Sequence, residues 1–454
     1  MIVDVLAVAA LLLAPIVVLS YRHAPVLVLA VVLLSLAVPV AVLDADPVAN
    51  AVLHPGVTTW TPRILLPTVV MLLALLPFAP WPRYEDRRPA LALLVLPVLA
   101  VATVAVWDGT SNQWAGVVHL STAALAWVVG ARLAPWLGVR TSYDTVVVGT
   151  VLAFFAVQLA LCLLQLGGGA LAVEASDQGL SRARGTFGHA GDLGKVVVAL
   201  MALVLPWTVS PVTRLRWAAT AALGAGFLVI GTTLSRANIL AGGVLLVVWA
   251  FAISRRRFSG RAFGIVLLAG VASLPFVGAL LARFRLDPEG GSRPELLQAA
   301  LAQLRRAPWW GTGPNSYVDV VSAYDVATAS GLPVHNAALL FLCELGIVLC
   351  VPLAVGGVVL VVRALAARRS ADPFASASAA ALLAAVMAGL VIAVTGWGLL
   401  KGTVLLTWVL VPALLYHRFA RVAPTEAPPG ARAAHDRSLP GRTDGRVLTG
   451  GTVR

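Results

Sequence analysis

His335 and Asn336 stand where a polar loop meets a long apolar run, in the stretch SGLPVHNAALLFLCELGIVLCVPL over residues 330–353. A neutral imidazole near pH 7 can accept a proton from a hydroxyl group, and nearby apolar surroundings favour its uncharged form. Asn336 beside it can cap the following helix or orient a ligand. The plainer alternative is a histidine at a helix terminus whose nitrogens bond to water or backbone.

Three arginines lie at other boundaries between polar and apolar segments. Arg184 lies in SRARGTFGHAGDLGK, Arg236 in the tight turn of GTTLSRANILAGG, and Arg293 at the start of a predicted loop helix. A guanidinium offers a planar fork of donors that matches phosphate oxygens, so several forks would neutralise a pyrophosphate at the level of lipid headgroups. The alternative is scattered surface charge, in which each arginine reaches the membrane interface or pairs with a nearby acid.

The composition predicts the elements that position these residues. Hydrophobic residues make up 59% of the 454 and charged residues 12%, and the mean hydropathy is +0.91. Apolar runs of about 17 to 25 residues, enough to cross about 30 Å of hydrocarbon as a helix, recur along the chain. We therefore predict an all-α, polytopic integral membrane protein with about 12–13 transmembrane helices. The thirteen runs lie near residues 2–19, 25–43, 64–79, 90–107, 115–134, 145–166, 192–210, 216–233, 237–253, 262–282, 335–362, 374–395 and 401–417.

The distribution of basic residues predicts the orientation of these helices. If residues 283–334 lie outside, then 22 of the 33 basic residues fall in inner loops and the C-terminal tail. Short basic inner loops are what the positive-inside rule describes. We therefore predict an outer N-terminus and an inner C-terminus. The net charge of +13 then reflects membrane topology, and we expect no nucleic acid partner.

The chain divides into a membrane domain, residues 1–417, and a disordered, basic cytoplasmic tail, residues 418–454. The membrane domain contains one large extracytoplasmic loop, residues 283–334. Within that loop, Ser292 and Glu295 have the spacing of a capping box, which predicts the start of a helix.

This predicted loop helix is amphipathic and lies on the outer surface. Leu297, Leu301 and Leu304 fall on one of its faces, and Pro308 ends it after about three turns. In the predicted helix that begins at His335, Glu344 lies on the opposite side from His335 and deeper in the membrane. We therefore expect Glu344 to pair with a buried donor from another span.

Several kinds of site are missing from the sequence. GTGPNSY lacks the lysine of a nucleotide-binding loop, so ATP is not the expected energy source. The outer loops contain no pair of aspartates suited to a divalent metal, and Asp44 and Asp46 read better as a short acidic turn. The three cysteines fall within predicted spans and form no disulfide framework. We expect no cofactor and no metal.

Three stretches give the chain a resemblance to a known family. They are RGTFGHAGDLG at 184–194, TLSRANILAGG at 233–243, and SRPELLQAALAQLRRAPWWGTGPNSY with HNAALLFLCELGI between 292 and 347. Over roughly residues 180–350 the chain resembles the O-antigen ligase and polysaccharide polymerase superfamily of bacterial inner-membrane glycosyltransferases. We call these stretches the first, second and third signatures.

The resemblance implies roles for individual residues. The catalytic histidine of the large loop, which activates the acceptor hydroxyl, would be His335, with Asn336 in support. The arginines that hold the pyrophosphate of the donor would be Arg184, Arg236 and Arg293. Where the family has Asn-Pro-Asn in the first signature, this chain has HAGD at 189–192. His189 would then occupy the place of an asparagine or act as a second titrating group.

The implied reaction is transfer of a glycan from a polyprenyl-pyrophosphate carrier to an acceptor sugar hydroxyl. It would take place at the outer face of the bacterial cytoplasmic membrane, as a ligase or a polymerase of surface polysaccharide assembly in the cell envelope. The partners would be the lipid-linked donor, such as an undecaprenyl pyrophosphate, a glycan or glycolipid acceptor, and the lipid bilayer. Two alternatives remain open: a transporter or flippase of lipid-linked glycans, and an inactive scaffold. We find no half-to-half repeat of the kind that transporters show.

Overall fold

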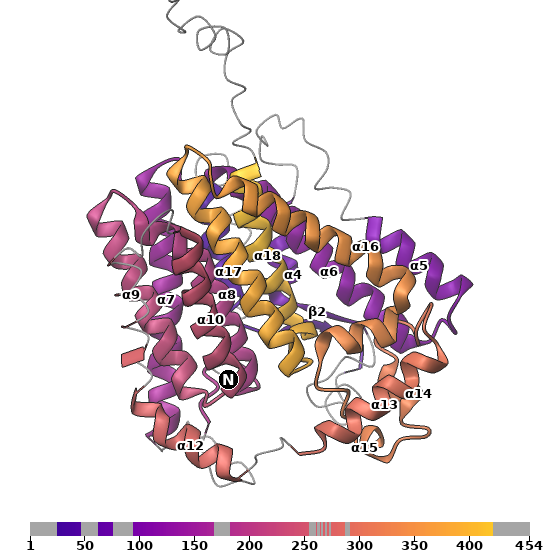
Figure 1. The fold of residues 1–454 in the computed structure, drawn as a ribbon. Coiled ribbons are helices and arrows are strands. Elements are labelled where there is room, and N and C mark those ends of the chain that lie inside the picture. The colour runs from indigo at the N-terminus through magenta and orange to yellow at the C-terminus, as the bar shows by residue number, and fades with distance from the viewer. Residues whose placement is uncertain are drawn as a thin grey trace, which may run out of the picture.

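The computed structural model describes residues 25–46, 62–75, 94–167, 182–253, 274–286 and 291–420, together with isolated positions between 260 and 271. Helices dominate among these residues (Figure 1). Their strands β1 (Ala41–Asp44) and β2 (Arg63–Leu65) form one antiparallel, two-stranded sheet. The prediction of an all-α polytopic membrane protein is confirmed, and the small sheet is an addition that the apolar runs did not indicate.

Eight helices in the described residues are long and apolar enough to cross a membrane, and each overlaps a run predicted from the sequence. These helices are α6 (Ser111–Leu133), α7 (Thr141–Leu166), α8 (Ala190–Val204), α9 (Thr213–Thr232), α10 (Arg236–Ile253), α16 (Ala337–Ala367), α17 (Pro373–Thr395) and α18 (Gly402–Ala420). The 3-10 turns η3 (Ala134–Trp136) and η4 (Leu205–Val209) lengthen α6 and α8. The chain is a multi-pass membrane protein.

Other predicted runs form shorter helices. α2 (Pro25–Ser35) and α5 (Val95–Ala105) have 11 residues each, and α4 (Leu66–Leu73) has 8 and begins directly after β2. The first predicted span, part of the tenth, and the tail from residue 421 onward lie outside the described residues. α18 ends at Ala420, inside the segment predicted as tail.

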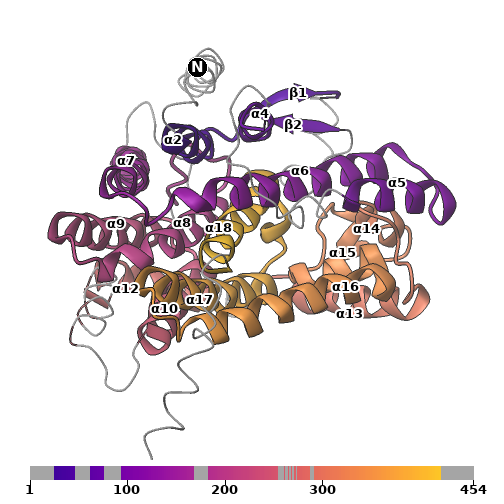
Figure 2. The same cartoon turned by 90° about the horizontal axis from the view of Figure 1, so that it is seen from above.

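α18 lies at the centre of the helix arrangement. It packs against α6 on one side and against α8 and α17 on the other, and Figure 2 shows it between the layer of α5 and α6 and the layer of α16 and α17. Around this centre, α7 packs on α9, and α10 packs on α17. The 3-10 turn η6 (Gly398–Leu400) connects α17 to α18. Residues 396–401, which directly precede α18, therefore lie between helices that are far apart in the sequence.

The predicted large loop folds into short helices beside the start of α16. α12 (Val277–Leu286) leads into it, and α13 (Arg293–Arg306), α14 (Tyr317–Val321) and α15 (Val326–Ala329) follow. We call α13, α14 and α15 the loop helices. A small core that includes Ala300, Tyr317 and Leu340 joins α13 and α14 to α16. The loop is thus an ordered layer attached to one end of a span.

The predicted surface helix is present as α13 and ends before Pro308, but two of its expected features differ. The capping box is absent, because the side chain of Ser292 makes no capping hydrogen bond. Leu297 and Leu301 are 43% and 41% exposed, whereas the face bearing Ala300 is buried. α13 instead buries the face that bears Leu296, Ala299, Ala300 and Gln303.

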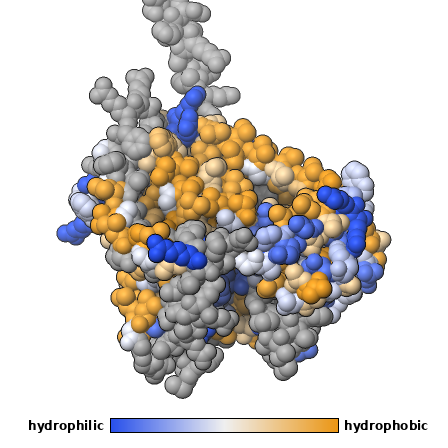
Figure 3. Space-filling view, turned by 60° about the horizontal axis from the view of Figure 1, so that its bottom comes forward, coloured by the Kyte–Doolittle hydropathy of each residue, from blue (hydrophilic) through white to orange (hydrophobic). Residues whose placement is uncertain are grey.

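Apolar side chains cover much of the molecular surface. On α16, Val351, Val355, Val358 and Val362 are each more than half exposed. Such a surface is unfavourable in water, but lipid tails cover it in a bilayer. Figure 3 shows apolar side chains over a broad area and polar side chains gathered on the right of the view. The loop helices lie on that side in Figure 1, as expected for a layer that faces water.

Candidate functional site

The third signature interlocks two parts of the chain at a break in α16. Gly346 has φ 66° and ψ 178°, a conformation that is essentially restricted to glycine. The N–H groups of Thr312 and Gly313 donate to the carbonyls of Cys343 and Glu344 at 3.0 and 2.8 Å. Beyond the break, the N–H groups of Ile347 and Val348 donate to the carbonyls of residues 308 and 309, which follow α13, at 2.9 and 3.1 Å. The predicted span 335–362 is present as α16 but contains a break at Gly346, and the loop satisfies the backbone groups that the break exposes.

Glu344 lies beside this break and its partner differs from the predicted one. Its Oε1 accepts a hydrogen bond from the N–H of Tyr317 at 3.5 Å, and the N–H of Asn315 is a second backbone partner. We expected a donor from another span. The loop supplies the donors instead, because the break in α16 draws residues 312–317 against the helix.

His335 lies at the junction between the loop helices and α16. It is half-buried, and its Nδ1 atom is buried without a hydrogen-bond partner. Burial and the nearby Arg293 guanidinium lower the pKa of His335 below its ordinary value of 6.5, while the Pro333 carbonyl raises it. Asn336 caps α16, because its Oδ1 accepts from the N–H of Leu339 at 2.9 Å. The imidazole at this junction is therefore held in its neutral form near pH 7.

The first signature forms the turn that leads into α8. His189 is the N-cap residue of α8, and its Nδ1 accepts from the N–H of Gly191 at 3.0 Å. Partial burial lowers the pKa of His189 to about 4; Lys401 and other cations add to this shift and Asp192 opposes it. Arg184 is exposed, and its Nη1 donates to the Gly188 carbonyl at 3.4 Å. His189 thus performs the capping role of an asparagine and stays uncharged near pH 7.

The second signature holds this turn in place. The side-chain amide of Asn238 in α10 donates from Nδ2 to the Gly191 carbonyl at 2.9 Å, and a Cβ atom at Gly194 would collide with that amide. Arg182, which lies just before the first signature, donates from Nε to the Thr233 carbonyl in the α9–α10 turn at 3.1 Å. Arg236 is the first residue of α10, directly after that turn.

The predicted site residues fall into two groups. Arg184, His189 and Arg236 lie around the starts of α8 and α10, whereas Arg293, His335 and Asn336 lie where the loop helices meet α16. Residues 396–401 connect the groups. At one end of this segment the N–H of Ala337 donates to the Gly396 carbonyl at 3.2 Å, and at the other end Lys401 Nζ lies 3.2 Å from Asp192 Oδ2 in α8.

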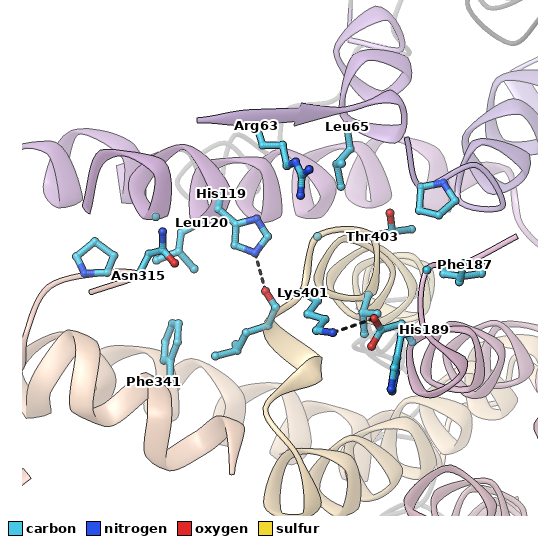
Figure 4. A pocket seen from close by; sticks show the side chains of 18 of the residues that line it. Arg63, Leu65, His119, Leu120, Phe187, His189, Asn315, Phe341, Lys401 and Thr403 are labelled. Atoms are coloured by element: carbon cyan, nitrogen blue, oxygen red, sulfur yellow. Dashed lines mark hydrogen bonds and ion pairs between the residues drawn. The ribbon is translucent and has the colours of Figure 1, made fainter. Parts of the chain in front are cut away.

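A cavity of about 490 Å³ lies beside this connecting segment, between α6, α8, α16 and the start of α18. Its polar lining residues are Arg63, His119, His189, Asp192, Asn315, Glu344, Lys401 and Thr403. In Figure 4, His119 points toward the Leu400 carbonyl, and Lys401 extends toward the side of the cavity where His189 lies. The cavity includes His189 but not the predicted His335 or the three predicted arginines.

Sequence reasoning missed most of the residues that line the cavity. His119 lies within an apolar run, and its Nε2 lies 2.6 Å from the Leu400 carbonyl oxygen. Arg63 and Lys401 are two of the basic residues on the predicted outer side, but nothing near them resembles a known motif. Lys401 and Lys195 both form ion pairs with Asp192, at 3.2 and 3.0 Å. A buried ion-pair cluster of this kind depends on helix packing, which spacing does not reveal.

Comparison with known proteins identifies the matched part of the chain. Residues 196–354, which contain the second and third signatures, match the family model described as O-antigen ligase. The resemblance to the O-antigen ligase-like superfamily is confirmed. No curated protein matches the chain. The family supports a ligase or polymerase role, and a glycosyltransferase-like activity, in polysaccharide assembly.

The O-antigen ligase region supplies only part of the cavity. Asn315 and Glu344 lie within the matched residues, whereas His119, Asp192 and Lys401 lie outside them. The interlocked loop and the break in α16 at Gly346 both lie within the O-antigen ligase region. The matched region therefore contributes the His335 side of the arrangement, and the flanking helices contribute most of the charged groups around the cavity.

Proposed function

We propose that the chain transfers a glycan from a polyprenyl-pyrophosphate carrier to a hydroxyl group of a glycan or glycolipid acceptor. The reaction takes place at the outer face of a bacterial cytoplasmic membrane, where the 283–334 loop of membrane domain 1–417 lies. The O-antigen ligase match and the multi-pass fold support this class of reaction. The observation that carries the proposal is a charged cavity directly beside the segment that connects to His335.

The proposed reaction makes one bond and breaks one. The acceptor oxygen bonds to the anomeric carbon of the glycan while the bond from that carbon to the pyrophosphate oxygen breaks. The hydroxyl proton goes to His335, and the electron pair leaves with the polyprenyl pyrophosphate. Cationic side chains stabilise the charge on that leaving group. Because the anomeric carbon is already activated, the reaction needs neither ATP nor a metal.

The environment of His335 supports its role as the proton acceptor. Its unpartnered Nδ1 is an unusual feature for a buried polar atom, and an acceptor hydroxyl would supply the missing hydrogen bond. The lowered pKa of His335 keeps the imidazole neutral at pH 7, as a general base requires. Arg293 beside it would then contact the donor, with Arg184 and Arg236 on the opposite side of residues 396–401.

We expect Arg236→Lys to weaken donor binding. The substitution keeps the positive charge but removes the planar fork, so a bidentate contact with pyrophosphate becomes a single one. The loss of one charge-assisted hydrogen bond predicts a rise of about tenfold or more in the KM for the lipid-linked donor. The matched control is Arg305→Lys on an exposed part of α13, which should leave KM unchanged. An unchanged donor KM in Arg236→Lys would contradict bidentate binding.

Product analysis tests the proposed function and distinguishes its two forms. Cells that make the lipid-linked repeat unit are compared with and without the chain, and the lengths of the carrier-linked glycans are measured. A polymerase lengthens these glycans without a second acceptor, whereas a ligase moves them to another molecule at unchanged length. Carrier-linked glycan that crosses the membrane without any new glycosidic bond would contradict both forms and favour a flippase.

A further inference from the structure

One carboxylate of the cavity is shared between two lysines. Asp192 Oδ1 lies 3.0 Å from Lys195 Nζ, and Asp192 Oδ2 lies 3.2 Å from Lys401 Nζ. All three side chains are less than a fifth exposed, at 14%, 12% and 17%. We call these three residues the lysine–aspartate cluster. With one acid and two ammonium groups, the cluster carries a net charge of +1.

The two lysines differ in their access to the cavity. Lys401 and Asp192 line it, whereas Lys195 does not. Lys195 lies against the backbone of η6, where a Cβ atom at Gly398 would collide with its ammonium group. Lys195 is therefore enclosed behind Asp192, and Lys401 is the ammonium group of the cluster that a ligand in the cavity can reach.

A buried ammonium group requires an anionic partner, since desolvation of an unpaired charge is strongly unfavourable. Asp192 is this partner for Lys401, but its carboxylate also forms an ion pair with Lys195. If another anion binds Lys401, then Asp192 keeps the ion pair with Lys195 and is not left unpaired. An exchange of partners at Lys401 thus avoids the cost that normally prevents a buried ion pair from opening.

We propose that the cavity binds a diphosphate ester through Lys401, and that Asp192 is an internal competitor which the diphosphate displaces from that lysine. The proposal rests on the proposed function, which makes the ester a polyprenyl pyrophosphate. A diphosphate carries more negative charge than a carboxylate and offers more acceptor oxygens, so it binds Lys401 more strongly. Asp192 thereby holds Lys401 in place and weakens the binding of ligands with less charge.

Two variants with the same net charge test the exchange. Asp192→Asn/Lys195→Met and Asp192→Asn/Lys401→Met both remove the carboxylate and one ammonium group, so each cluster keeps a charge of +1. Methionine retains most of the apolar stem, which limits the effect on packing. Binding of polyprenyl pyrophosphate to the purified full chain is measured by calorimetry, with inorganic pyrophosphate in a parallel titration to separate the lipid from the free anion.

The two variants should change affinity in opposite directions. Without Asp192, the remaining Lys401 of the first variant binds the diphosphate about tenfold more tightly than the unaltered chain, and the second variant binds it about tenfold more weakly. Equal affinities for the two variants would overturn the proposal. The two clusters have the same net charge, so an effect of net charge alone predicts the same affinity for both. An unaltered chain that binds neither ligand would instead overturn the assignment of the donor.

Labelling of the unaltered chain tests the exchange without any substitution. Lysine reactivity toward an amine reagent is measured by mass spectrometry with and without inorganic pyrophosphate and with polyprenyl pyrophosphate. The diphosphate should protect Lys401 severalfold and leave Lys195 unchanged. Protection of neither lysine, or of Lys195 alone, would contradict displacement at Lys401.

Discussion

Replacement of His335 by alanine is expected to lower glycan transfer by about 10²–10⁴-fold, the usual contribution of a general base. The alanine side chain cannot accept the proton of the acceptor hydroxyl, so the attacking oxygen keeps its proton in the rate-limiting step. The residue is half-buried and its Nδ1 has no hydrogen-bond partner, so its removal breaks no bond at that atom. Transfer is measured with purified protein at saturating donor and acceptor.

The control for His335→Ala is a substitution in the same loop. Val326→Ala changes a residue that is 89% exposed and should leave transfer unchanged. Both variants should reach the membrane in amounts similar to the unaltered chain. Full activity of a correctly inserted His335→Ala protein would remove this histidine from the mechanism and leave His189 and His119, which line the cavity, as the remaining candidates.

The pH dependence of transfer follows from the lowered pKa of His335. A general base acts in its neutral form, and burial together with Arg293 shifts protonation of His335 to below its ordinary pKa of 6.5. As the pH falls, the midpoint of the decline in transfer should therefore lie below pH 6.5. The rate at saturating substrate is measured across this range. A decline centred above pH 6.5 would indicate a different proton acceptor.

Gly346→Ala is expected to separate the loop from α16 and to reduce both stability and transfer. At φ 66° and ψ 178° an alanine costs about 1–3 kcal/mol of backbone strain, and its Cβ would collide with the carbonyl oxygen of Trp309. The hydrogen bonds between residues 308–313 and the break in α16 would be weakened together. Because this interlock positions the loop that carries His335, transfer should fall at least tenfold. Thermal unfolding and the transfer rate measure the two effects.

Gly356→Ala provides the matched control on the same helix. A Cβ atom there meets nothing within 4 Å, and alanine favours helix more than glycine does. This variant should be as stable and active as the unaltered chain. If Gly346→Ala behaved in the same way, the interlock would have no part in positioning His335.

The long apolar helices were the most predictable part of the structure. Each of the eight long apolar helices overlaps a predicted run, because the bilayer thickness constrains their length and composition. Asn336 caps α16, which is one of the two roles that its position before an apolar run indicated. The end of α13 before Pro308 follows from the chemistry of a single residue.

The contacts between helices could not be predicted in this way. In the sequence, Gly346 is one glycine within an apolar span, and nothing local indicates a break. The helix breaks there because segment 308–313 forms hydrogen bonds with residues on both sides of Gly346. The partner of Glu344 depends on that same docking. Lys401 and Asp192 are 209 residues apart, so no local pattern links them. The cavity therefore had to be found from the packing of α8 against α18.

The most direct test of the proposed function is the stoichiometry of one reaction in reconstituted vesicles. The full chain is supplied with a labelled glycan on polyprenyl pyrophosphate and with an acceptor, and the released carrier and the new glycosidic bonds are counted. We predict one polyprenyl pyrophosphate released for each glycosidic bond formed, and a loss of both products by about 10²-fold or more with His335→Ala. Movement of the intact lipid-linked glycan across the bilayer, with no carrier released, would contradict the assignment of the chain as a glycosyltransferase.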